Sequence, residues 1–75
     1  STNFNPRIYE NKVVWMDFRT YNNFNPDIYM YDLVTGKEIP IVTDKSYQTE
    51  PTIYENKVVW MDHRNGNYDI YMTTI

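Results

Sequence analysis

The residues with the clearest potential for chemistry are two matching groups of charged side chains. The groups are Asp17, Arg19 and Asp27 in the first half of the chain and Asp62, Arg64 and Asp69 in the second. Carboxylates near a turn can bind Ca²⁺, but a calcium loop needs oxygen ligands that are spaced more densely. Because both groups stand at a strand–turn–strand junction, we predict that they are structural, with an aspartate–arginine bridge that clamps each hairpin.

Other catalytic patterns are missing from the sequence. His63 is the only histidine, and a lone histidine without a nucleophile makes no catalytic triad. The chain has no cysteine and only two glycines, so it has no thiolate metal site and no glycine-rich phosphate loop. We therefore predict no catalytic residues, no metal and no cofactor. His63 replaces Phe18 of the first half, and we expect it to be a packing or surface residue.

One loop is a candidate for contact with a partner. It contains Tyr21, Asn22, Asn23 and Phe24, where the second half has a shorter turn. Aromatic and asparagine side chains on an exposed loop suit contact with a protein or a carbohydrate. The alternative is that Tyr21 or Phe24 packs back over its own sheet.

The composition of the 75 residues favours strands and argues against two classes of partner. The chain has eight tyrosines, two tryptophans, one leucine and no alanine. Its net charge is −3 and its seven basic residues are scattered, whereas nucleic-acid binding needs a basic stripe. No apolar run is long enough to span a membrane, so we expect neither nucleic-acid binding nor membrane insertion.

A repeat organises the whole chain. The ten residues IYENKVVWMD stand at 8–17 and again at 53–62, and DIYM stands at 27–30 and again at 69–72. The offsets are 45 and 42, so the loop between the two motifs is three residues shorter in the second copy. Such a period is typical of β-propeller blades. Trp15 and Trp60 recur in both copies, which indicates core packing.

One repeat unit is expected to form four strands. They are Arg7–Glu10, Lys12–Phe18, Asp27–Leu33 and Glu38–Thr43. Turn residues separate them: Glu10-Asn11, Thr35-Gly36 and, in the second copy, Asn65-Gly66. Asn5-Pro6 and Glu50-Pro51 are expected to open the two units.

The faces of these strands indicate burial on both sides. Val13 and Trp15 point one way while Val14 and Met16 point the other, and all four are apolar. A half-exposed sheet would alternate apolar and polar residues. Pro40 cannot donate to a strand ladder, so the fourth strand is expected at a sheet edge.

The segment VVWMDHRNGNYDIYM at 58–72 resembles the repeat of TolB-type β-propellers and related bacterial and archaeal surface propellers. Asp32–Gly36 matches the hairpin of that repeat, and the resemblance extends from about Pro6 to Met72. It implies an all-β fold of propeller blades and a role as a binding platform. It also implies an extracellular, cell-surface or periplasmic location.

The strand count predicts an incomplete array. Residues 1–50 form a first blade of four strands, and residues 51–75 form a second blade of three, about 1.75 blades in all. Both ends of the array expose apolar faces that need a cover. We expect a non-enzymatic scaffold or binding module that closes a ring with copies of itself, as a trimer or tetramer. The alternative is a slice of a longer propeller that gates or supports an enzyme such as a peptidase.

Overall fold

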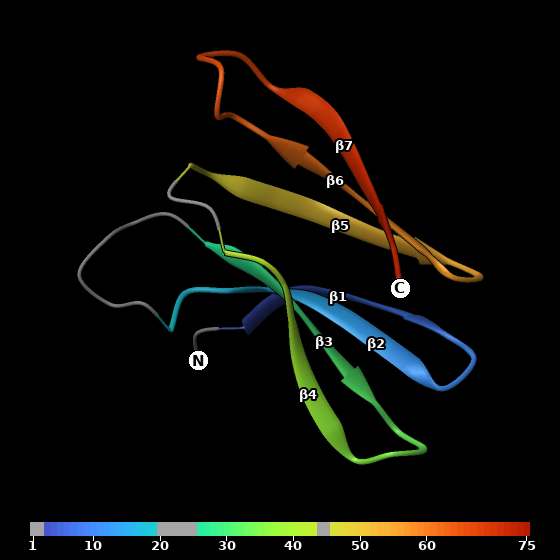
Figure 1. The fold of residues 1–75 in the computed structure, drawn as a ribbon. Helices are drawn as coiled ribbons and strands as arrows, with labels where there is room; N and C mark the ends of the chain where they lie inside the picture. The colour runs from blue at the N-terminus through green and yellow to red at the C-terminus, as the bar shows by residue number, and fades with distance from the viewer. Residues whose placement is uncertain (1–2, 20–25, 44–45) are drawn as a thin grey trace.

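The computed structural model describes residues 3–19, 26–43 and 46–75, which form two antiparallel β-sheets (Figure 1). Sheet 1 has the strand order β1 (Asn3–Tyr9), β2 (Lys12–Asp17), β3 (Asp27–Asp32), β4 (Lys37–Val42). Sheet 2 has the order β5 (Gln48–Tyr54), β6 (Lys57–Asp62), β7 (Asp69–Thr74). The prediction of an all-β chain is confirmed for the described part, which also contains no helix long and apolar enough to cross a membrane.

The first strand of each sheet begins earlier than predicted. β1 begins at Asn3 rather than Arg7, and β5 begins at Gln48, before Pro51. We expected Asn5-Pro6 and Glu50-Pro51 to be turns that open each unit, but these pairs lie inside the strands.

A bulge explains this difference. Asn5 and Glu50 have φ angles of 54° and 56°, in the left-handed region, and the pairing register shifts around both. A bulge tolerates a proline, which has no N–H to donate, and the ladder resumes on its far side. Pairing therefore continues across each Asn/Glu-Pro step.

The predicted hairpins are present. Gly36 has a φ of 70° between β3 and β4, and Gly66 has a φ of 85° between β6 and β7. The Asp32 carboxylate accepts hydrogen bonds from the backbone N–H groups of Val34 (2.9 Å) and Thr35 (3.2 Å), which holds the first of these turns. β4, with Pro40, lies at the edge of sheet 1 as predicted.

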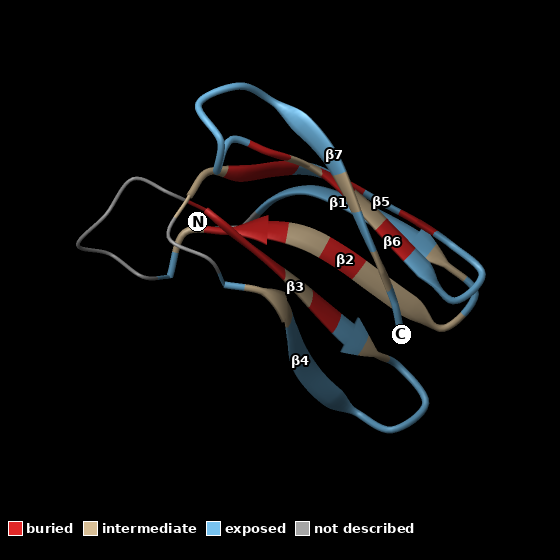
Figure 2. Cartoon of the chain, turned by 45° about the horizontal axis from the view of Figure 1, so that its top comes forward, coloured by how far each residue is buried: buried red, intermediate tan, exposed pale blue. Residues whose placement is uncertain are grey.

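The two sheets pack through β5, which lies against β1, β2 and β3 (Figure 1). The sheets lie closest there and diverge towards β4 and β7. Seven buried side chains from both sheets form the core: Val14, Met16, Ile28, Met30, Ile53, Val58 and Trp60. Alternate residues of the inner strands are buried, so one face of each sheet is covered by the other sheet within this chain (Figure 2).

Candidate functional site

The first charged cluster is built around Asp17, at the end of β2. Its carboxylate is only 1% exposed. Trp15 Nε1 donates to Asp17 Oδ2 at 2.8 Å, because alternate residues of a strand share a face. The Arg19 backbone N–H and Nε donate to Oδ1 at 2.8 and 2.9 Å, and Arg19 Nη2 donates to Oδ2 at 2.7 Å. The predicted bridge therefore joins two residues of one chain segment.

Arg19 connects this cluster to the other strands of sheet 1. Its guanidinium lies 3.8 Å from the ring centroid of Tyr29 on β3. It also binds both carboxylate oxygens of Glu38 on β4, at 2.6 and 2.9 Å. A two-pronged arginine–carboxylate contact fixes direction as well as distance. Arg19 thus ties β2, β3 and β4 together.

The second cluster repeats this arrangement around Asp62, which is fully buried. Trp60 Nε1 donates to Asp62 Oδ2 at 3.1 Å, and Arg64 Nη2 donates to the same oxygen at 2.7 Å. Ser46 Oγ and the Arg64 backbone N–H donate to Oδ1, each at 2.9 Å. The Arg64 guanidinium lies 4.2 Å from the Tyr71 ring centroid.

These contacts keep both aspartates ionised. Burial by itself raises the pKa of Asp17, but hydrogen bonds from Arg19 and Trp15 outweigh it and hold that pKa below its usual value. The hydrogen bond from Arg64 is the largest cause that holds the pKa of Asp62 far below its usual value, against the opposing effect of burial. A carboxylate whose lone pairs are all occupied by donors is a poor proton carrier, so the geometry is that of a structural bridge.

The other two predicted aspartates begin β3 and β7, opposite Asp17 and Asp62 in the strand register. Asp27 is 7% exposed and stands opposite Asp17 in the strand register. Asp69 is exposed and accepts a long hydrogen bond of 3.5 Å from Asn65 Nδ2. Across the described ranges, no three histidine, cysteine, aspartate or glutamate side chains come together in a way that could hold a metal ion.

Sequence reasoning missed several members of the clusters. Trp15 and Trp60 were expected only as core residues, yet their indole N–H groups bind the aspartates. Their place two residues before each aspartate was the available signal, since residues two apart on a strand share a face. The role of Glu38 could not be predicted from the repeat, because the second copy in this sequence has no residue that matches Glu38.

Of the remaining predicted residues, the structure places only His63. Tyr21, Asn22, Asn23 and Phe24 lie outside the described residues. The ring of His63 lies edge-on to Tyr68, with ring centroids 4.8 Å apart, while Phe18 packs against Phe4 at 5.5 Å.

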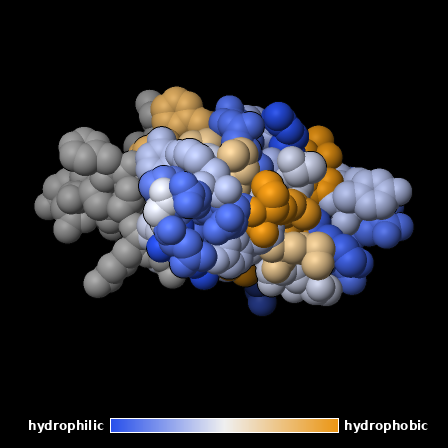
Figure 3. All heavy atoms as spheres, turned by 90° about the horizontal axis from the view of Figure 1, so that it is seen from above, coloured by the Kyte–Doolittle hydropathy of each residue, from blue (hydrophilic) through white to orange (hydrophobic). Residues whose placement is uncertain are grey.

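Each of the two sheets also has an apolar face that is not covered by the other sheet. On sheet 2, the open face carries Val59, Met61, Ile70 and Met72. Ile70 is 70% exposed and Met72 is 58% exposed. Viewed from above, the side on which β6 and β7 lie in Figure 1, the surface carries apolar side chains among hydrophilic ones (Figure 3).

The open face of sheet 1 uses the other set of alternate residues. It carries Ile8, which is 64% exposed, together with the half-buried Val13, Trp15 and Tyr29. Apart from Tyr29, the residues named on both open faces are therefore identical to core residues of the other repeat copy.

Comparison with known proteins adds no family assignment. No protein-family model matches the chain, and no curated protein sequence is significantly similar to it.

Proposed function

We propose that this chain is a non-enzymatic scaffold module whose two sheets are β-propeller blades and which assembles head to tail with copies of itself. One observation carries the proposal. The internal contact buries one face of sheet 1 and the opposite face of sheet 2, and each of the seven core residues has an identical counterpart on an open face. Ile28 is fully buried and Ile70 is 70% exposed, although they are the same residue of the repeat.

The open face of one chain is suited to the open face of the next. Sheet 1 presents Ile8, Val13 and Trp15, the counterparts of the buried Ile53, Val58 and Trp60. The open face of sheet 2 carries the counterparts of the sheet 1 residues that are buried against sheet 2 within the chain. A second copy can therefore repeat the internal contact with the same residues.

Such a contact is heterologous, because it joins two different faces. Heterologous contacts form rings when the rotation closes and filaments when it does not. The divergence of the sheets away from β1 and β5 favours closure, because wedge-shaped units stack around an axis (Figure 1). With two blades in each chain, a trimer gives six blades and a tetramer gives eight, within the usual range for propellers.

The same module would act as a binding platform through its loops. In a ring, the loop that contains Tyr21, Asn22, Asn23 and Phe24 would appear once in each chain along one rim. Several weak contacts with a protein or carbohydrate partner would then reinforce one another through their effective concentration.

Light scattering coupled to size exclusion tests the assembly. The expected mass is three or four times the chain mass of 9.1 kDa. An Ile70→Asp variant places a charge on the open face of sheet 2 and is expected to release folded monomers, or to shift the mass strongly downwards. Val34→Asp is the matched control, because Val34 is 77% exposed on the β3–β4 turn and away from both faces.

Two results would contradict the proposal. One is a compact, cooperatively unfolding wild-type species of 9.1 kDa. The other is an assembly whose mass does not respond to Ile70→Asp, since that assembly would not use this face.

A further inference from the structure

We infer that the bulge residues Asn5 and Glu50 determine which sheets stack on each other. A sheet with asparagine at this position accepts a sheet with glutamate, whereas two sheets with glutamate repel each other. The apolar core cannot make this choice, because each of its seven residues has an identical counterpart in the other repeat copy. Specificity must come from residues that differ between the copies and that meet across the sheets.

The contact between Asn5 and Glu50 meets both conditions. The two residues stand at the same position of the repeat, 45 residues apart, and Asn5 Nδ2 donates to Glu50 Oε1 at 3.5 Å. The same amide group donates to Met16 Sδ of the core at 3.1 Å, which holds the asparagine side chain at the junction of the sheets. The contact between Tyr9 and Tyr54 also joins the sheets, but it cannot distinguish the copies, because both residues are tyrosines.

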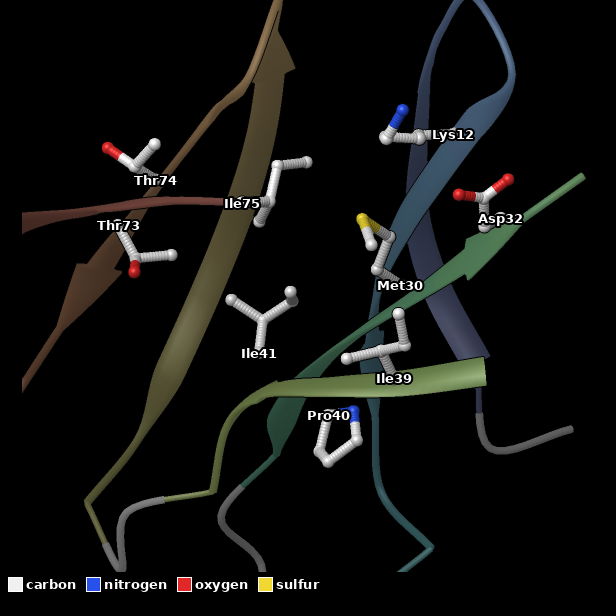
Figure 4. A pocket seen from close by; sticks show the side chains of 9 residues that line it. All are labelled: Lys12, Met30, Asp32, Ile39, Pro40, Ile41, Thr73, Thr74 and Ile75. Carbon is white, nitrogen blue, oxygen red and sulfur yellow. The ribbon is translucent and has the colours of Figure 1, made fainter. Parts of the chain in front are cut away.

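The bulges lie on the side where the two sheets are closest. β5 packs against β1, β2 and β3, whereas a hollow of about 440 Å³ lies between the sheets on the side of β4 (Figure 4). Ile39 and Ile41 line the hollow from β4, and Thr73 and Ile75 line it from sheet 2. Contacts that discriminate between sheets are therefore expected beside β1 and β5.

The backbone of the bulge favours asparagine over glutamate. Asn5 and Glu50 have φ angles of 54° and 56°, in the left-handed region. Asparagine adopts this region more often than most residues, because its short polar side chain can form local hydrogen bonds. Glu50 therefore stands where asparagine would suit the backbone better, and it gives the second copy a carboxylate that the first copy lacks at this position.

Charge at this position decides which neighbour is accepted. Glu50 is exposed, and none of the ion pairs between described residues includes it. An asparagine opposite this carboxylate donates a hydrogen bond, whereas a second carboxylate adds repulsion between like charges. In a head-to-tail stack the two residue types alternate, so no two glutamates become neighbours. Between chains this conclusion rests on the assembly proposed above, but within one chain it does not.

A charge swap tests the inference. Asn5→Glu places two glutamates at the junction. Asn5→Gln is the matched control, because glutamine has the shape of glutamate without its charge. The double variant Asn5→Glu/Glu50→Asn exchanges the two residues and keeps one asparagine and one glutamate in the two bulges. Urea unfolding of each variant is measured in low salt and in about 1 M NaCl, where the Debye length is only about 3 Å.

The charged single variant is expected to be the least stable. In low salt, Asn5→Glu should have a lower urea midpoint than Asn5→Gln, and about 1 M NaCl should remove most of that difference. The double variant should recover the wild-type midpoint. In light scattering of the same samples, Asn5→Glu should raise the dissociation constant of the assembly roughly two- to fivefold relative to Asn5→Gln, and the exchange should restore it.

Equal urea midpoints of Asn5→Glu and Asn5→Gln in low salt would overturn the inference, because charge would then have no effect on the contact. A double variant that is no more stable than Asn5→Glu would overturn it as well, since the two positions would not act on each other. An assembly with equal dissociation constants in both single variants would overturn it for contacts between chains. A wild-type mass of one chain would contradict only the proposed assembly, because the unfolding comparison measures the contact within a single chain.

Discussion

Tyr9 and Tyr54 occupy the same position in the two copies of the repeat, and their rings contact each other, with centroids 5.1 Å apart. Asn5 and Glu50, another matching pair, also meet, through a hydrogen bond of 3.5 Å. Matching positions meet only when one sheet is placed above the other in the same orientation. The internal contact is thus a stack of two equivalent sheets, in which Tyr54 remains 65% exposed.

The first prediction compares two methionines at the same repeat position. Met30 is 4% exposed and Met72 is 58% exposed. If assembly buries the open face of sheet 2, Met72→Ala should destabilise the protein almost as much as Met30→Ala, by about 2–5 kcal/mol. Urea unfolding at a concentration that favours assembly measures both. A Met72→Ala variant with wild-type stability would mean that this face stays open to solvent.

The second prediction concerns the buried carboxylate of Asp62. Asp62→Ala removes the acceptor for the Trp60 indole N–H and for Arg64, and is expected to lower the free energy of unfolding by about 1–3 kcal/mol. Thermal unfolding monitored by circular dichroism provides the measurement. Asp69→Ala is the matched control, because Asp69 is exposed and lies outside the cluster. Equal stability of the two variants would contradict a structural role for the bridge.

The third prediction follows from the low pKa values of Asp17 and Asp62. Aspartate in an unfolded chain has a pKa of about 3.9. Because folding lowers both pKa values, the stabilisation is fully present above that pH and is lost as the pH falls through the folded values. The urea midpoint should therefore be nearly constant from pH 7 to about 5 and fall steeply below about 4. In the Asp62→Asn variant the fall should be smaller, and an identical pH profile would exclude this carboxylate as its cause.

The fourth prediction concerns the loop from residue 20 to residue 26. Replacing it with the Asn-Gly-Asn turn of the second copy should leave the mass of the assembly unchanged, because loops tolerate changes of length. It should also remove binding to any protein or carbohydrate that wild-type protein captures from a defined partner panel. Retained binding would show that the extra residues are neutral. A matched insertion into the β3–β4 turn at Thr35-Gly36 controls for general effects of loop length.

Much of the fold could be predicted from local pattern. Alternation of apolar residues placed Val14 and Met16 on one face of β2 and Val13 and Trp15 on the other, and Pro40 placed β4 at an edge. The starts of β1 and β5 could not be predicted, because pairing resumes past a bulge only if Asn5 and Glu50 adopt left-handed backbone angles that most residues avoid. The contact between Arg19 and Glu38 on β4 could not be predicted either, because the two residues are 19 positions apart in the sequence.

The repeat, the strand alternation and the two aspartate–arginine pairs follow from the sequence, because each depends on residues that lie close together in the chain. The sequence could not determine which face of each sheet is buried. Ile28 and Ile70 stand in the same local sequence, DIYM, yet one is fully buried and the other is 70% exposed. Both faces of these strands are apolar, so only the side on which the other sheet lies decides between them, and that is a property of the tertiary structure.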